Sequence, residues 1–94
     1  MESILQKEKR CFICGLYEPV EDHHIYFGNA NRQISEEHGF KVWLCYEHHR
    51  GTLGVHGKLG HSLDLRLKET CERKYISLGH TKEEFIKLIG KNFI

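Results

Sequence analysis

The segment Leu44–Gly51, LCYEHHRG, places two adjacent histidines, His48 and His49, three and four residues after a cysteine. A second histidine doublet, His23 and His24, lies upstream. Neighbouring side chains point to opposite faces of a strand and diverge by about 100° around a helix, so adjacent histidines rarely bind one metal ion equally well. Each doublet therefore indicates two different roles, one for each histidine.

A structural metal site is the first of these roles. Cys11 and Cys14 have the spacing of a metal-binding turn, and Cys45 and His48 have the spacing of a second pair of ligands. The chain has 94 residues, and a domain of this size usually needs a metal, a disulfide or a partner to be stable. We therefore expect these four residues to bind zinc; the alternative is a reduced redox CxxC motif beside an unrelated cysteine.

Composition bounds the cellular setting. The first ten residues lack the apolar core of a secretory signal, and no apolar run approaches membrane-spanning length, so a reducing cytoplasm without membrane association is expected. The net charge of +1 argues weakly against a nucleic-acid partner. However, residues 1–49 carry five Lys/Arg against eight Asp/Glu, and residues 50–94 carry nine against five. Bound dications would shift the first half toward neutral or positive charge.

The hydrophobic pattern predicts an α+β fold in one domain, residues 1–94, without a repeat or an evident linker. We expect strands over residues 20–27 and 40–45, separated by a polar loop over residues 29–39 that holds about one helical turn. A helix should begin near Cys45. This metal-rich core, about residues 11–56, precedes a helical extension of about residues 62–94.

The residue pattern of the helical extension predicts two helices. An apolar residue recurs every four positions, which marks the buried stripe of a helix that ends at Gly79: Leu63, Leu67, Cys71 and Tyr75. Thr81 and Glu84 have the spacing of a capping box at the start of the last helix. Its packing face comprises Phe85, Leu88, Ile89 and Phe93. Cys71 is therefore expected to be a buried core thiol, whereas His38, His61 and His80 are expected to be solvated or capping residues.

The expected elements also bring three imidazoles together. Cys45 and His48 share one face of the incipient helix, so His49 turns away from the zinc site. His49 can then face the strand that carries His23 and His24. In such a cluster one or two imidazoles hold a divalent ion, while another, left without metal, takes a proton from water.

These motifs resemble a known family. CxxC at residues 11–14, HHI at 23–25 and LCxxHH at 44–49 are similar to the motifs of HNH endonucleases with the ββα-metal fold, in the zinc-bound, treble-clef-like subgroup. The similarity runs from Cys11 to about His49. Further matches, which include SEEHG at 35–39 and RGTLGVH at 50–56, resemble phage recombination-associated nucleases of the Ref type.

The resemblance implies a role for each matching residue. His24 matches the general base, His23 the metal ligand before it, and His49 the ligand that closes the motif. The matching structural zinc ligands are Cys11, Cys14, Cys45 and His48. His56 follows His49 by seven residues and is a candidate further ligand or phosphate contact, although Gly51 and Gly54 argue against one unbroken helix between them.

One position departs from the family pattern. The middle Asn of the motif, which braces the loop that orients the general base, is replaced by Phe40. The candidate substitutes are Asn29, Asn31 or a backbone carbonyl. The orientation of His24 is therefore the feature that the sequence leaves open.

The implied activity is metal-dependent hydrolysis of DNA phosphodiester bonds, which yields 5′-phosphate and 3′-hydroxyl ends. His24 would activate water, and the catalytic divalent ion, Zn²⁺, Mn²⁺, Ni²⁺ or Mg²⁺, would be held by His23, His49 and His56. The candidate phosphate contacts are Arg32, Arg50 and Lys58. The Ref-type resemblance implies DNA and a recombinase filament as partners, in the cytoplasm of a phage-infected host.

Two other classes of function fit the same motifs. The first is a non-catalytic zinc-binding module that recognises DNA or protein, which predicts one zinc ion per chain and a dispensable His24. The second is a structural or regulatory phage protein that kept the fold and lost catalysis, which agrees with the absent Asn. Metal content tests the first, and a plasmid-nicking assay tests the second.

Overall fold

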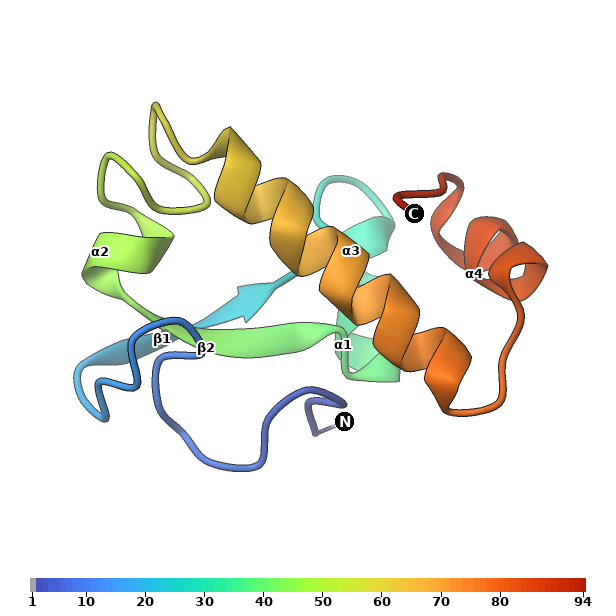
Figure 1. The fold of residues 1–94 in the computed structure, drawn as a ribbon, viewed down its shortest axis with the longest axis horizontal. Helices are drawn as coiled ribbons and strands as arrows, with labels where there is room; N and C mark the ends of the chain where they lie inside the picture. The colour runs from blue at the N-terminus through green and yellow to red at the C-terminus, as the bar shows by residue number, and fades with distance from the viewer. Residues whose placement is uncertain (1) are drawn as a thin grey trace.

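The computed structural model describes residues 2–94; Met1, the first residue of the expected domain, lies outside them. The described residues form an α+β fold, as the sequence predicts, with two strands and four helices (Figure 1). Their order is β1 (Val20–His24), α1 (Asn31–His38), β2 (Lys41–Cys45), α2 (Tyr46–His49), α3 (His61–Ser77) and α4 (Lys82–Ile89). In Figure 1, the long helix α3 crosses the hairpin, and α4 lies beyond the C-terminal end of α3.

Strands β1 and β2 form an antiparallel hairpin that separates the residues of the first histidine doublet. His23 pairs with Val42, and both are buried, whereas His24 pairs with Lys41 on the opposite face. The alternation follows from the two-residue period of a strand. The first strand was expected to continue to Phe27 but ends at His24. Beyond it, only the bond from the Ile25 N–H to the Phe40 carbonyl extends the pairing before the chain turns into α1.

The segment expected to be mostly loop is an eight-residue helix, α1. The helix is attached to the rest of the chain by a polar residue, Ser35. The Ser35 hydroxyl donates to the Tyr26 carbonyl at 2.6 Å and accepts from the Tyr26 N–H at 3.2 Å. Gly39 ends the helix in the left-handed conformation, with φ 74°. The expectation of about one helical turn was therefore wrong, because one buried hydroxyl replaces the apolar stripe that periodicity detects.

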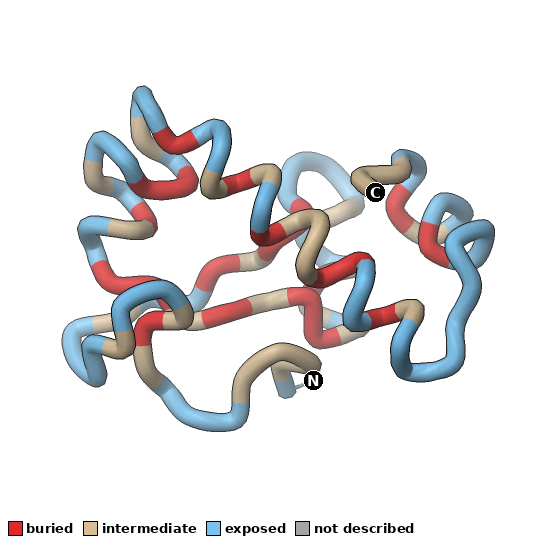
Figure 2. The backbone as a smooth tube through the Cα atoms, viewed as in Figure 1, coloured by how far each residue is buried: buried red, intermediate tan, exposed pale blue. Residues whose placement is uncertain are grey.

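The helical extension follows the sequence pattern closely. Leu67, Cys71 and Tyr75 are buried along α3, and Figure 2 shows the buried segments of α3 facing those of the hairpin. Helix α4 begins with the expected capping box, in which the Thr81 hydroxyl accepts from the Glu84 N–H and the Glu84 carboxylate accepts from the Thr81 N–H. Aromatic rings of both halves meet in one core: Tyr26, Phe40, Tyr75, Phe85 and Phe93.

Helix α2 is a single turn, and the chain after it folds back in a glycine-rich loop. The N–H groups of Val55 and His56 donate to the carbonyls of His48 and His49, so the loop is tied directly to α2. A Cβ at Gly57 would collide with the Gly51 carbonyl, which makes glycine necessary for this close approach. His56 therefore reaches the end of α2 through a folded loop and not through a continuous helix.

Candidate metal centres and catalytic site

Four ligands from two distant segments meet at the Cys/His cluster, defined as Cys11, Cys14, Cys45 and His48. The Cys14 and Cys45 sulfurs are 3.8 Å apart, and His48 Nδ1 lies 3.7 Å from the Cys11 sulfur and 3.2 Å from the Cys45 sulfur. Tetrahedral sulfur and nitrogen ligands of zinc stand roughly 3.5–3.8 Å apart, a range that includes the first two distances and lies slightly above the third. The cluster therefore fits one metal ion, and all its cysteines are free thiols.

The local backbone favours a thiolate in this cluster. Burial opposes ionisation of Cys11, but backbone hydrogen bonds from Cys14, Cys45 and Ile13 outweigh it and lower the pKa of Cys11 to about 6. Burial raises the pKa of Cys45, so the two thiols do not ionise alike. Thiolates are the form that binds metal, and at least one is therefore available near neutral pH.

Three imidazoles form a second group, the imidazole cluster, defined as His23 on β1, His49 at the end of α2 and His56 in the loop. Ring centroids are 5.2 Å apart for His23 and His49, 5.1 Å for His23 and His56, and 4.9 Å for His49 and His56. One nitrogen of each ring lies within 4.8 Å of the others. The three side chains thus converge from separate parts of the chain.

The nitrogens of this cluster fit a metal ion. His23 Nε2 is buried and has no hydrogen-bond partner among residues 2–94, and burial, together with the neighbouring histidines His49 and His56, lowers the pKa of His23 to about 3. A buried polar atom normally has a partner, so a neutral imidazole facing two others is suited to bind a cation. His49 Nδ1 faces the Glu21 carboxylate at 2.7 Å, which leaves Nε2 of His49 available as a metal ligand.

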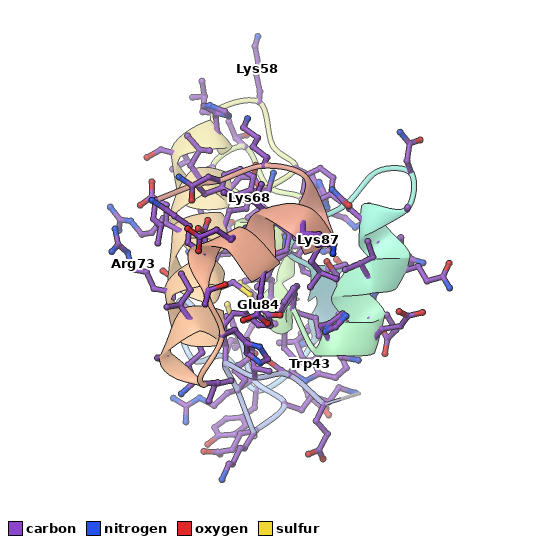
Figure 3. The ribbon with its side chains drawn as sticks, turned by 90° about the vertical axis from the view of Figure 1, so that its right-hand side faces the viewer. Trp43, Lys58, Lys68, Arg73, Glu84 and Lys87 are labelled. Atoms are coloured by element: carbon purple, nitrogen blue, oxygen red, sulfur yellow. The ribbon has the colours of Figure 1, made fainter. Side chains whose placement is uncertain are left out.

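The imidazole cluster opens into the histidine hollow, a cavity of about 240 Å³. Its lining includes His24, Asp22, Arg32 and Arg50 beside the three clustered histidines. Lys58, the third expected phosphate contact, does not line it and extends away from the body of the molecule in Figure 3. The structure therefore brings together every proposed residue of the catalytic site except Lys58.

Comparisons with family models, curated proteins and solved structures give no match to this chain. No helix within residues 2–94 is long and apolar enough to cross a membrane. The interpretation of the site thus depends on its own geometry.

His24 has a carboxylate partner that the motifs did not indicate. Its Nε2 lies 2.8 Å from Oε1 of Glu36 on α1, and the Asp22 carboxylate is 3.9 Å away. Glu36 Oε2 accepts from the Lys41 ammonium at 2.8 Å. This bond and the bond to His24 lower the pKa of Glu36 to about 2. His24 is therefore held beside a carboxylate that stays ionised at neutral pH.

The expected substitutes for the absent Asn have different surroundings. Phe40, at the Asn position, is fully buried among aromatic rings. The Asn31 amide donates to the Ile89 carbonyl at 3.3 Å and so ties α1 to α4. Asn29 lines a hollow together with His24, but the hydrogen bond of the His24 ring goes to Glu36.

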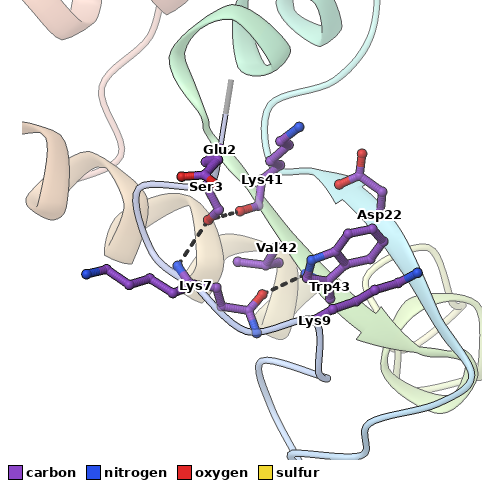
Figure 4. A pocket seen from close by; sticks show the side chains of 9 residues that line it. Glu2, Ser3, Lys7, Lys9, Asp22, Lys41, Val42 and Trp43 are labelled. Carbon is purple, nitrogen blue, oxygen red and sulfur yellow. Dashed lines mark hydrogen bonds between the residues drawn. The ribbon is translucent and has the colours of Figure 1, made fainter.

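Sequence reasoning missed both carboxylates that contact the candidate site imidazoles, Glu21 at His49 and Glu36 at His24. Glu21 had a usable signal, because it lies two residues before His23 and therefore on the same face of the strand. Glu36 lies in the SEEHG match at residues 35–39, but that match does not pair it with His24, and its segment was expected to be mostly loop. Another hollow has a volume of about 510 Å³, and its lining includes Lys7, Lys9 and Trp43 but no histidine or cysteine (Figure 4). A large cavity alone therefore does not mark the candidate site.

Proposed function

We propose that the chain is a metal-dependent HNH endonuclease that hydrolyses phosphodiester bonds in DNA, with a zinc-stabilised ββα-metal core formed by β1, β2 and α2. The observation that supports this most directly is the histidine hollow, where three convergent imidazoles lie beside His24 and two arginines. A metal site with only three protein ligands leaves a position for substrate or water, which is typical of catalysis.

In this proposal the Cys/His cluster holds zinc and stabilises the hairpin end. His23, His49 and His56 hold the second ion. When bound there, a divalent ion supplies positive charge next to the phosphoryl oxygens and the departing oxygen. Arg32 and Arg50 add two further positive charges in the same hollow, which suits contacts to the phosphates on either side of the scissile bond.

His24 is the proposed general base. It takes a proton from water as the water oxygen forms a bond to phosphorus, and the P–O3′ bond breaks on the opposite side. The departing 3′ oxygen takes its proton from water, which leaves 5′-phosphate and 3′-hydroxyl ends. His23 and His24 line the same hollow, which supports a proposal in which the metal ligand and the base act on one phosphate.

DNA as substrate, a recombinase filament as partner and the cytoplasm of an infected host as location come from the Ref-type resemblance. They belong to the same proposal. A recombinase filament on the DNA would explain a chain that carries few basic residues near its site, because the partner would then contribute to DNA binding.

Metal stoichiometry and a cleavage assay test the proposal together. We expect two ions per chain, and nicking of plasmid DNA, naked or coated with recombinase, after addition of Mn²⁺, Zn²⁺, Ni²⁺ or Mg²⁺. His24→Ala should retain both ions and lose cutting by about 10²–10⁴-fold, the usual contribution of a general base. His61→Ala, which removes an exposed histidine outside the hollow, should cut normally.

Three outcomes separate the readings. Unchanged cutting by His24→Ala removes His24 as the base. One ion per chain without cutting favours the non-catalytic zinc-binding module. Two ions without cutting, even on recombinase filaments, favours a protein that kept the fold and lost catalysis.

A further inference from the structure

The contact between His24 and Glu36 fixes how the proposed base is presented. The distance from Nε2 to Oε1 is 2.8 Å, a hydrogen-bond length, and the His24 side chain is only 11% exposed. An ionised carboxylate accepts hydrogen bonds and donates none, so Nε2 must carry the proton. The other ring nitrogen, Nδ1, is then unprotonated in the neutral imidazole.

Glu36 is itself held in place from two directions. Its second oxygen accepts from the Lys41 ammonium at 2.8 Å, and Lys41 is the cross-strand partner of His24. Ser35, the residue before Glu36, anchors α1 to the hairpin through its buried hydroxyl. The carboxylate therefore stands on a rigid element, and the His24 ring has a fixed acceptor on one side.

We propose that Glu36 is the positioning residue for His24 and takes the place of the Asn that Phe40 replaces. This rests on the proposed function. Glu36 holds the Nε2–H tautomer, so that Nδ1 takes the proton from water. The imidazolium that forms is then stabilised by the adjacent carboxylate, which does not itself need to take up the proton.

The Glu21–His49 pair supports this reading by contrast. Glu21 binds Nδ1 of His49 and leaves Nε2 available, whereas Glu36 binds Nε2 of His24 and leaves Nδ1 available. In each pair the acid selects which nitrogen does the chemistry. One pair prepares a metal ligand, and the other prepares a base.

Kinetics of three variants test the positioning role. Glu36→Ala should lower kcat by between about tenfold and the 10²–10⁴-fold of a lost general base, with little change in KM. Glu36→Gln should restore part of kcat, because an amide oxygen accepts the same hydrogen bond. Glu37→Gln, a matched change at the next residue of α1, where the partner is Gln33, should match wild type. Wild-type kcat in Glu36→Ala would overturn the proposal.

Nitrogen NMR of the His24 ring gives a second readout that needs no cleavage. In the metal-loaded wild-type chain we expect the Nε2–H tautomer, and in Glu36→Ala a mixture of both tautomers. A wild-type Nδ1–H tautomer would overturn the proposal even if the protein cuts DNA. Conversely, a chain that never cuts but shows the expected tautomer change would disprove the nuclease and retain the Glu36–His24 pair.

Discussion

The Cys/His cluster and the imidazole cluster share helix α2 but differ in how many ligands the chain supplies. The first has four ligands, two of them from the turn before β1. The second has three, and it opens into a hollow. Four protein ligands satisfy a tetrahedral ion, whereas three leave a coordination position for another molecule. Under the proposed function, this difference would separate an ion that stabilises the fold from one available for chemistry.

In each histidine doublet the two residues have different surroundings. His48 belongs to the Cys/His cluster and His49 to the imidazole cluster, because consecutive helical residues diverge. His23 faces the core and His24 the opposite side, because consecutive strand residues alternate. Local geometry alone thus directs the two members of each adjacent pair to different sites.

Removing one ligand from each cluster should produce the largest difference, because one variant should unfold and the other should lose only an ion. Cys45→Ser should abolish cooperative folding, since a structural zinc site contributes on the order of 10 kcal/mol and a whole domain is stable by only about 5–15 kcal/mol. His49→Ala should remain folded and lose only the second ion. Thermal unfolding with metal analysis checks both. Similar melting temperatures for the two variants would mean that the clusters do not differ in this way.

Replacing Glu21, whose carboxylate contacts His49, should weaken metal binding only at the imidazole cluster. Glu21→Gln should weaken binding of the second ion by about 10–100-fold, the usual effect of a lost partner behind a metal-ligating imidazole. Competition titration with a chelator measures this, and the ion of the Cys/His cluster should be unaffected. Glu47→Gln, an exposed carboxylate on α2, is the control. Equal affinities in wild type and Glu21→Gln would show that Glu21 merely pairs with Arg50.

The sequence predicts the parts of this molecule in which spacing determines geometry. Cys45 is the last residue of β2 and the N-cap of α2, and its three-residue spacing from His48 brings both to one site. The stripe from Leu63 to Tyr75 requires only helical periodicity. Helix α1 escaped prediction because its anchor is one buried hydroxyl, Ser35, which carries no periodic signal.

The remaining site residues depend on tertiary structure. No motif paired Glu36 with His24, because Glu36 comes from α1 and meets His24 only in the folded chain. His56 reaches His49 because a glycine-rich loop folds back on α2, a contact that depends on backbone approach and not on residue spacing. The sequence therefore does not predict that α1 packs beside β1 or that the glycine-rich loop folds back on α2. The first of these contacts determines which residue holds His24.

The capping box of α4 lies outside both clusters and gives a smaller effect. Thr81→Ala should lower the free energy of unfolding by about 1 kcal/mol and leave both ions in place. The Thr81 backbone N–H and the His80 ring lower the pKa of Glu84, so the contribution of its charge is complete above the ordinary pKa and lost as pH falls through the lowered value. Denaturant unfolding at pH 7 and at lower pH checks this.

Thr70→Ala, on the exposed side of α3, is the control for that experiment. Its hydroxyl bonds only the Arg66 carbonyl one turn earlier and caps no helix end. A loss equal to that of Thr81→Ala would mean that the capping box adds nothing beyond an ordinary helical hydroxyl.

Replacing Arg50 should give the smallest effect, a change in the salt dependence of DNA affinity. This change tests whether the proposed DNA substrate contacts Arg50 beside the imidazole cluster. In a His24→Ala background, Arg50→Ala should reduce the slope of log affinity against log salt by about 0.9, the value for one phosphate contact, which is roughly a threefold change between 50 and 200 mM salt. Arg73→Ala removes the same charge from exposed α3 and should leave the slope unchanged. A reduced slope in Lys58→Ala would extend the DNA path along the loop, whereas an unchanged slope in Arg50→Ala would place the phosphates elsewhere.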